Sequence, residues 1–311
     1  MRLAHLLPIL LLASSVATAC AATSPSITDY RPVSQSCRDK AGHELTAIRS
    51  FTRDGVPSLL LADPRTFATS TAPATDLRCT DAPAAPNTPL RQEITELTAP
   101  PYRLQNHGLT HARTKGNGEF LTVDLCPSSR PFERGMFETV ENLPQQKIGP
   151  VPVAVSITGT WLLKHPTELA WLKEQQAKGR LAITWVNHSL THPYKPKAPL
   201  DRTFLLTPGL DTDREILEEE RLMLANGITP SVFFRFPGLV ADGGLITKLR
   251  RLSLIPLGAD AWLAKGEVPT AGSIILVHGN GNEPAGIRRL LPLLHEPGRL
   301  YLLPLADALV P

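Results

Sequence analysis

The alternation of apolar runs and helical patterns after Gly118 is the feature that most constrains the fold. The apolar runs are short enough to be buried strands: 120–125, 151–157, 181–186, 231–236, 254–257, 274–277 and 300–303. Helical patterns lie between them, at 165–178, 212–226, 245–252 and 284–294. Asp211 or Thr212 is expected to begin the second of these helices, and Gly227 to follow its end. Strands that alternate with helices predict a parallel sheet, either open or closed into a barrel.

The first residues, 1–21, have the pattern of an export signal. Arg2 provides the positive charge, residues 3–16 are mostly apolar, and small residues at 17–19 form a cleavage pattern. Cys20 follows directly, so a lipid anchor on Cys20 and plain cleavage nearby are both open. No later stretch approaches the roughly 18 apolar residues that span a bilayer. We therefore expect an exported protein, which is periplasmic, secreted or tethered as a lipoprotein.

Residues 22–117 are predicted to form a small, loop-rich N-terminal module that includes a Pro/Ala-rich linker. Only short strands are expected, at 45–51 and 58–61. Cys37 and Cys79 flank this segment, and export implies an oxidising compartment, so they are the expected disulfide. Such a link could stabilise a small module by ~3–4 kcal/mol. The formal net charge is only +3 and no basic stripe is present, so nucleic acid is not an expected partner.

Polar residues follow four of the predicted strands after Gly118. The C-terminal ends of parallel strands are where such folds place their chemistry. His188 and His192 come after the strand at 181–186. Side chains at i and i+4 share one side of a helical turn, so both imidazoles could bind one metal ion. A polar surface turn is the alternative interpretation of this pair.

Asp124 and Arg235 lie at the ends of two other strands. Asp124 could be a metal ligand, a general base or a turn residue. Arg235 lies among apolar residues, where an unpaired cation is costly, so a carboxylate partner is expected. The turn at Pro237 and Gly238 would leave the Gly238 N–H available as a donor. Arg235 could instead form a purely structural ion pair.

His278 ends the strand at 274–277 and suits a general acid near neutral pH. Asp260 and Trp262 lie upstream and could orient His278 or tune its pKa. A loop carboxylate and a core aromatic residue are the alternative interpretations of these two.

In this order, the four clusters resemble the polysaccharide deacetylase family, the NodB-homology domain, over residues 118–311. The segment from His188 to His192 resembles the His-Ser/Thr-x-x-His metal motif of that family. Arg235-Phe236-Pro237 resembles its Arg-x-Pro motif, and Leu276-Val277-His278 its terminal Leu-x-His motif. Asp260 and Trp262 loosely resemble an Asp-Trp motif with Ala261 inserted. The resemblance implies an irregular (β/α)7 barrel that removes N- or O-linked acetyl groups from sugars.

The resemblance also implies a role for each residue. A divalent metal ion, expected to be zinc, would be held by His188 and His192, and Asp124 would be the general base. His278 would be the general acid, with Asp260 tuning it, and Arg235 would hold Asp124 in place. The Gly238 N–H would stabilise the oxyanion, while Leu276 and Trp262 would line the substrate pocket. The expected partner is an acetylated polysaccharide or peptidoglycan.

The first motif departs from the family pattern. The family usually has Thr-Phe-Asp-Asp, in which the second Asp is the third metal ligand, whereas this chain has Leu125 at that position. Three interpretations are open. Asp124 is the ligand, or Asp124 is the base and two histidines with water hold the ion, or Cys126 is the third ligand rather than a buried small residue. The loss also leaves a degenerate, glycan-binding protein as an alternative function, and the Tyr that usually follows Arg-x-Pro is Gly238.

Overall fold

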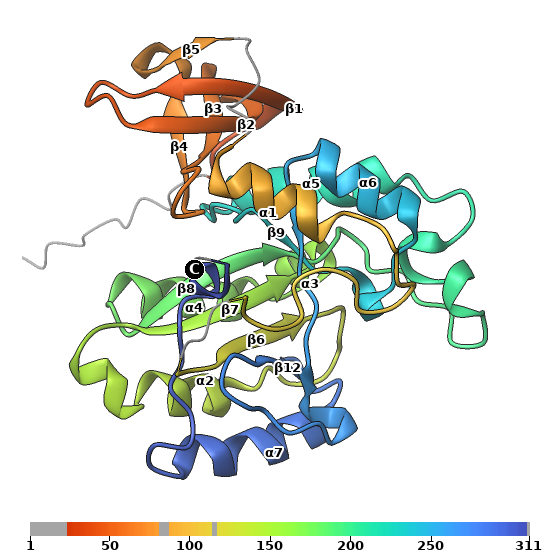
Figure 1. Cartoon of the computed structure of the whole chain (residues 1–311). Coiled ribbons are helices and arrows are strands. Elements are labelled where there is room, and N and C mark those ends of the chain that lie inside the picture. Colours follow the sequence, from red (N-terminus) through yellow and green to blue (C-terminus); the bar gives the residue numbers. More distant parts are fainter. Residues whose placement is uncertain (1–23, 81–86, 114–116, 310–311) are drawn as a thin grey trace, which may run out of the picture.

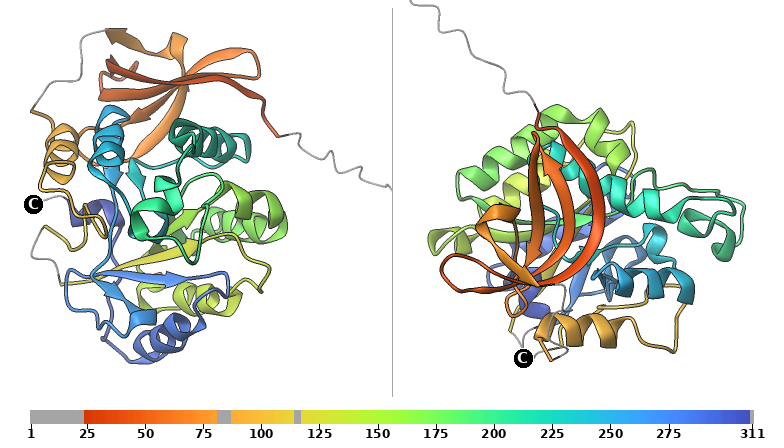
Figure 2. Two further views of the ribbon diagram at one scale, coloured as in Figure 1. Left: turned by 90° about the vertical axis from the view of Figure 1, so that its right-hand side faces the viewer. Right: turned by 90° about the horizontal axis from the view of Figure 1, so that it is seen from above.

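The structure is a computed structural model, and it describes residues 24–80, 87–113 and 117–309. An N-terminal antiparallel sheet is stacked on a larger α/β unit (Figure 1). Two further views show the same stacking of the two parts (Figure 2). The expected export signal at 1–21, including Cys20, and most of the Pro/Ala-rich linker lie outside the described residues. Among the described residues, no helix is both long and apolar enough to cross a membrane.

The larger unit is built on a curled parallel sheet with the strand order β10-β9-β8-β7-β6-β12-β11. The strands are β6 (Phe120–Leu125), β7 (Val151–Ile157), β8 (Leu181–Asn187), β9 (Phe233–Phe234), β10 (Ile255–Pro256), β11 (Ala261–Trp262) and β12 (Ile274–His278). Every neighbouring pair is parallel. β6 is buried along its whole length, as expected for a strand covered on both faces. The expected irregular (β/α)7 barrel is confirmed, and its edge strands β10 and β11 are not neighbours in the sheet order.

One predicted strand of the barrel is wrong. Residues 300–303 form no strand, and Leu302 makes only a single bridge to Glu119. The seventh strand is instead β11, which is two residues long. Leu302 is buried as part of a connecting loop, so its apolar character reports burial rather than strand pairing. A two-residue strand is too short to show periodicity in the sequence.

The helices cover the barrel. They are α1 (Pro89–Leu97), α2 (Arg134–Glu141), α3 (Gly159–Lys164), α4 (Pro166–Ala177), α5 (Thr212–Ala225), α6 (Gly243–Arg251) and α7 (Pro284–His295). Short 3-10 segments are η1 (Ala74–Asp76), η2 (Pro144–Lys147), η3 (Leu200–Arg202), η4 (Phe204–Leu206), η5 (Pro237–Leu239), η6 (Leu263–Lys265) and η7 (Leu305–Ala308). The predicted α4 to α7 are present within about two residues at each end, a usual margin for helix boundaries. Asp211 caps α5 by accepting from the Arg214 N–H, and Gly227 follows the helix at φ 71°.

The N-terminal module is more regular than the predicted loop-rich unit. Its antiparallel sheet has the order β4-β3-β2-β1-β5. The strands are β1 (Ile27–Arg38), β2 (Glu44–Arg53), β3 (Val56–Ala62), β4 (Thr69–Pro73) and β5 (Arg78–Thr80). The sequence did not predict β1, because its exposed and buried positions do not alternate regularly and Pro32 interrupts it. The expected disulfide between Cys37 and Cys79 is present and joins β1 to β5.

A buried ion pair fixes the N-terminal sheet to the barrel. Arg49 of β2 donates to Glu220 of α5, with an Nε–Oε2 distance of 2.6 Å, and also to the Leu252 carbonyl. Tyr30 of β1 donates to the same Glu220 carboxylate. Arg49 and Glu220 are almost completely buried, so removal of either would leave an uncompensated charge. The two modules are therefore held in a defined relative position.

Glu219, which precedes Glu220 on α5, is a buried carboxyl group without a partner among the described residues. It is fully buried, and neither carboxylate oxygen has a hydrogen-bond partner among the described residues. Burial, and then the charges of Glu215, Glu220 and Glu218, hold the pKa of Glu219 well above its usual value. The folded protein therefore holds the Glu219 proton to higher pH than the unfolded chain, in which a glutamate ionises with a pKa of about 4.3. Its favourable contribution is therefore complete at low pH and is lost as pH rises toward the folded-state pKa.

We expect Glu219→Gln to be more stable than the parent protein at neutral pH. The gain is about 1.4 kcal/mol for each pH unit over which Glu219 is protonated only in the folded protein. Urea unfolding at several pH values between 4 and about 8 measures this gain. The exposed Glu138→Gln is the matched control. A gain that does not grow with pH would contradict the assignment.

Candidate active site

A cavity of about 560 Å³ lies at the C-terminal ends of β6, β8 and β12. Most of the residues singled out from the sequence line it: Asp124, His188, His192, Gly238, Trp262, Leu276 and His278. Residues that the sequence did not single out line it as well, notably Tyr194, Phe204 and Glu283. The parallel sheet thus brings together strand-end residues that are as far apart in the sequence as Asp124 and His278.

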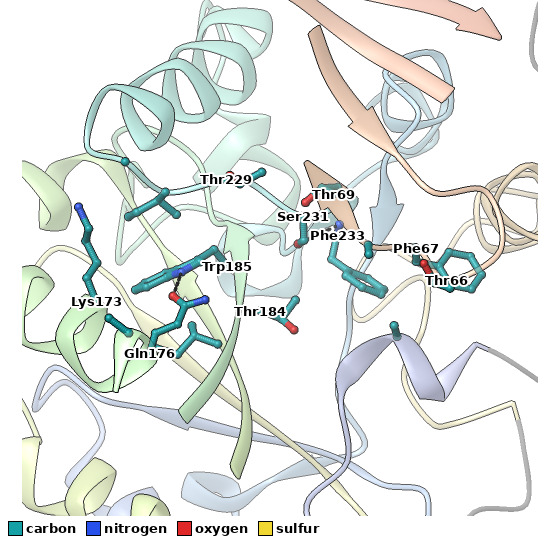
Figure 3. Close-up of a pocket in the computed structure, with 16 residues that line it drawn as sticks. Thr66, Phe67, Thr69, Lys173, Gln176, Thr184, Trp185, Thr229, Ser231 and Phe233 are labelled. Carbon is teal, nitrogen blue, oxygen red and sulfur yellow. Dashed lines mark hydrogen bonds between the residues drawn. The ribbon is translucent and has the colours of Figure 1, made fainter. Parts of the chain in front are cut away.

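A second cavity, of about 610 Å³, lies away from these residues, between the N-terminal module and the barrel (Figure 3). In it, the Trp185 Nε1–H donates to Gln176 Oε1, and Lys173 Nζ donates to the Asn226 carbonyl. Lys173 is the only titratable residue among the described residues that line it. The described lining of the larger cavity therefore does not combine an acid with a base, and the smaller cavity is the candidate active site.

Asp124 and Arg235 form a buried ion pair beneath the candidate active site. One Arg235 nitrogen donates to Asp124 Oδ1 at 3.0 Å and to Thr122 Oγ1 at 2.7 Å. The other terminal nitrogen donates to the Gly258 carbonyl at 2.9 Å. Burial alone would raise the pKa of Asp124, but Arg235, with smaller effects of His188 and His278, outweighs burial and lowers this pKa. Asp124 is therefore a carboxylate at neutral pH, and it is the partner that Arg235 was expected to need.

His188 and His192 lie close together, but not on the helical turn that their spacing predicted. They follow β8 in an irregular loop, with φ 71° at Ser189 and 48° at His192. The two ring centroids are 4.9 Å apart. His188 Nδ1 lies 2.8 Å from the Arg235 carbonyl, which can only accept, so Nδ1 carries the proton and Nε2 is left as the ligand atom.

Cys126 lies close to the two histidines. Its Sγ lies 3.5 Å from His188 Nε2. The ligand atoms of Cys126, His188 and His192 all lie within 4.8 Å of one another, and they are the one such cluster within the described parts of the chain. Burial would raise the pKa of the Cys126 thiol, but His192, His278 and His188 outweigh burial and hold it well below its usual value. The second Asp124 oxygen, Oδ2, lies 3.7 Å from His188 Nε2, but Asp124 is not part of the cluster.

The carboxylate beside His278 is Glu283. The prediction that Asp260 lies next to His278 and tunes its pKa is wrong. Glu283 Oε2 lies 3.0 Å from His278 Nδ1, and it accepts a hydrogen bond from Trp262 Nε1 at 2.7 Å. Asp260 instead interacts with His111 Nδ1 at 2.6 Å and accepts from the Ile274 N–H at 2.8 Å. Since Ile274 begins β12 and His278 ends it, Asp260 lies at the opposite end of the strand, about 13 Å from His278 at the rise of a β-strand.

Glu283 was missed because it is placed by a loop. It comes five residues after His278, beyond the Gly-Asn-Gly-Asn segment, and directly precedes α7 as its N-cap residue. Nothing in the spacing indicates whether such a loop turns its last residue back onto the histidine. A carboxylate closely following a strand-end histidine was the only available signal. Burial would lower the pKa of His278, but Cys126 and Glu283, with Asp124, hold it well above its usual value.

Phe204 forms the wall beside Gly238. Gly238 has φ 62°, and a Cβ there would lie only 2.4 Å from Phe204 Cε2. The Phe204 ring thus fills the space where a side chain at position 238 would lie. Tyr194 stacks on Phe204 with ring centroids 5.1 Å apart, and Tyr194 is 60% exposed. Two stacked aromatic rings therefore line the candidate active site beside Gly238.

Comparison with known proteins gives matches for both modules. A protein-family model described as "RP012 protein N-terminal domain" matches residues 28–90, within the N-terminal module. A family 4 carbohydrate esterase from Bacillus anthracis is 19% identical and has a TM-score of 0.46, covering 65% of this chain and 87% of its own. The chitin deacetylase from Colletotrichum lindemuthianum is 14% identical with a TM-score of 0.44, covering 66% of this chain and 92% of its own.

The matched structures bear names from the polysaccharide deacetylase family that the motifs resemble. They also include a family 4 pseudoenzyme from Bacillus anthracis, which is 13% identical with a TM-score of 0.44 and covers 66% of this chain and 70% of its own.

The buried pair predicts a large effect of Arg235 on stability. We expect Arg235→Met to lower the free energy of unfolding by about 3–5 kcal/mol, because Asp124 is left buried without its partner. Urea denaturation measures this loss. The double variant Arg235→Met, Asp124→Leu removes both charges and should recover much of the stability. Equal losses in the single and double variants would argue against the ion pair as the cause.

Proposed function

We propose that this chain is a metal-dependent deacetylase that removes N- or O-linked acetyl groups from an extracellular or cell-envelope polysaccharide. One observation carries the proposal. The Asp124 carboxylate held by Arg235, His278 with its raised pKa, and His188 and His192, the first held through Nδ1 by the Arg235 carbonyl, all line one cavity. A protein that only binds a glycan needs no base, acid and metal ligands in the same place.

The donor set fits a divalent metal ion, expected to be zinc. His188 Nε2 is available because Nδ1 is held by the Arg235 carbonyl, and His192 lies beside it. When bound, such an ion supplies Lewis acidity, which polarises the acyl carbonyl and makes a water molecule more acidic. Imidazole nitrogens are ordinary ligands for zinc and similar ions. The chain therefore offers a place for the cofactor that this reaction needs.

Asp124 is suited to act as the general base. Its lowered pKa keeps it ionised at neutral pH, and Arg235 holds one of its oxygens in place. Asp124 would accept a proton from water as the water oxygen bonds to the acyl carbon. The carbonyl electron pair moves onto oxygen, and the Gly238 N–H is the proposed donor to that oxyanion. Leu276, which is buried at the cavity lining, would contact the acetyl methyl group.

His278 is suited to act as the general acid. Its raised pKa keeps the imidazole protonated at neutral pH, and Glu283 lies beside Nδ1. As the bond from the acyl carbon to nitrogen or oxygen breaks, His278 would give its proton to the leaving amine or alkoxide. Acetate and the free sugar group are the products. Proton acceptance and proton donation thus fall to two different residues of one cavity.

The cavity mouth supports a sugar substrate such as peptidoglycan or an exopolysaccharide. Tyr194 and Phe204 stack on each other in the cavity lining, and Trp262 also lines the cavity. Flat aromatic faces combine apolar area with a polar edge, which suits the C–H faces and hydroxyl groups of a pyranose. The proposed location is outside the cytoplasm, on the strength of the export pattern at 1–21. A lipid anchor at Cys20 stays a prediction.

Acetate release tests the proposed function directly. The substrates are N-acetylated chitin oligomers, peptidoglycan fragments and O-acetylated xylan, with zinc-loaded protein. Asp124→Asn should lower the rate by about 100- to 10,000-fold, the usual contribution of a general base, and His188→Ala should lose metal and activity together. Asp260→Asn is the matched control, because this carboxylate lies away from the cavity. Metal binding without acetate release from any substrate would favour the glycan-binding alternative.

The pH dependence tests the role of Glu283. Cys126 and then Glu283 raise the pKa of His278, so the acid form should persist to higher pH than for a free histidine. In Glu283→Gln the support from Glu283 is lost, and the pKa of His278 falls. We expect the alkaline limb of the kcat profile to move to lower pH by about one unit, the size of effect of one neighbouring charge. An unmoved alkaline limb would exclude this role.

A further inference from the structure

We propose that Cys126 is the third protein ligand of the metal ion, so that the ion is held by one thiolate and two imidazoles. What the ion does rests on the proposed function, whereas the identity of the atoms that bind it is a separate question. A thiolate from residue 126 would supply the third ligand that Leu125 cannot provide.

The positions of the three ligand atoms fit one ion. Metal bonds of about 2.0–2.1 Å to imidazole and about 2.3 Å to thiolate, in tetrahedral geometry, place a sulfur and a nitrogen ligand about 3.5 Å apart. Cys126 Sγ and His188 Nε2 are separated by 3.5 Å. His192 completes a cluster whose ligand atoms lie within 4.8 Å of one another. Three protein ligands leave a fourth position open for water and substrate, as in catalytic zinc sites.

Leu125 does not point into the cavity. Successive side chains of a strand face opposite sides, so Asp124 and Cys126 share one side while Leu125 faces the other. Leu125 is fully buried in the same apolar cluster as Val123 and Phe137. A carboxylate at position 125 on this backbone would therefore be placed in the core that packs against α2. The change at position 125 fits a strand end that directs residue 126 toward the histidines.

The backbone around Cys126 is held in place from both neighbouring strands. The Cys126 carbonyl accepts from the Asn280 side chain at 2.6 Å. The Leu125 carbonyl accepts from Thr158 Oγ1 at 3.0 Å, and the Gly279 N–H donates to the Asp124 carbonyl at 3.0 Å. Hydrogen bonds of this kind, one shell beyond the ligands, orient metal-binding side chains. The thiol is therefore presented to the histidines by a fixed frame.

A cysteine ligand frees Asp124 for its other role. Asp124 Oδ1 is engaged by Arg235, and Asp124 lies outside the ligand cluster. With Cys126 as ligand, the proposed base and the third ligand are separate residues. Thiolate is a soft ligand, so the site should prefer zinc or cobalt over magnesium or manganese. The sulfur proton is released when the ion binds.

Cobalt binding tests the ligand without reference to activity. Every sample is the full chain with Cys20→Ser, so that Cys20 cannot contribute a thiolate. Cys37 and Cys79 are paired, and Cys126 is then the free cysteine within the described ranges. Metal-free protein is titrated with Co²⁺, and the near-ultraviolet sulfur-to-cobalt charge-transfer band is recorded. We expect this band in the parent protein and in Asp124→Asn, and its loss in Cys126→Ser. Zinc affinity, from competition with a chelator, should fall at least about tenfold in Cys126→Ser.

Cys126 could instead be a nucleophile, and alkylation with iodoacetamide distinguishes the two roles. Bound zinc should protect Cys126 from iodoacetamide if the sulfur is a ligand. Cobalt binding without a sulfur band, an unchanged zinc affinity in Cys126→Ser, or alkylation that zinc does not slow would each overturn the proposal. A sulfur band together with no acetate release from any substrate would leave the ligand assignment supported and overturn only the deacetylase function. A deacetylase whose cobalt form lacks the band would do the reverse.

Discussion

The buried ion pair between Arg235 and Asp124 is the interaction on which the rest of the site depends. Arg235 follows β9, and its guanidinium reaches Thr122 and Asp124 of β6 and the carbonyl of Gly258 after β10. Its own carbonyl accepts from His188 Nδ1. One residue therefore lowers the pKa of Asp124, the proposed base, and fixes the tautomer of His188, a proposed metal ligand. A lysine could not make these planar, divergent contacts at the same time.

The carboxylate beside His278 shows that a required charge can be supplied by a different segment of the chain. A negative charge near Nδ1 favours the protonated acid, and this physical requirement does not specify which loop supplies it. Here Glu283, at the start of α7, supplies it and also fixes Trp262. Asp260 is used instead to hold the beginning of β12 and to contact His111 of the segment before the barrel. The wall beside Gly238 is likewise supplied by another segment, because the Phe204 ring fills the space where a side chain at position 238 would lie.

Much of the barrel could be predicted because its long elements repeat a local pattern. β6, β7, β8 and β12 are mostly apolar runs of at least five residues, the helices α4 to α7 are nine or more residues long, and turn or capping residues such as Asp211 and Gly227 lie at helix ends. β11, with two residues, and α2 and α3, with eight and six residues, are too short for such a pattern. β1 was missed for a different reason, because its burial does not alternate, and residues 300–303 were misread because burial in a loop also selects leucine.

The sequence by itself determined the chemistry available to this protein. It shows which polar residues end the strands of a parallel sheet, and it shows that a carboxylate is absent at position 125. Only the tertiary structure decided which of those residues meet. Cys126 and His188 are 62 positions apart, and their atoms come within 3.5 Å because β6 and β8 lie on either side of β7. Glu283, rather than Asp260, lies beside His278 because a loop returns to the strand end. Such contacts depend on packing between distant segments, and local patterns carry no record of them.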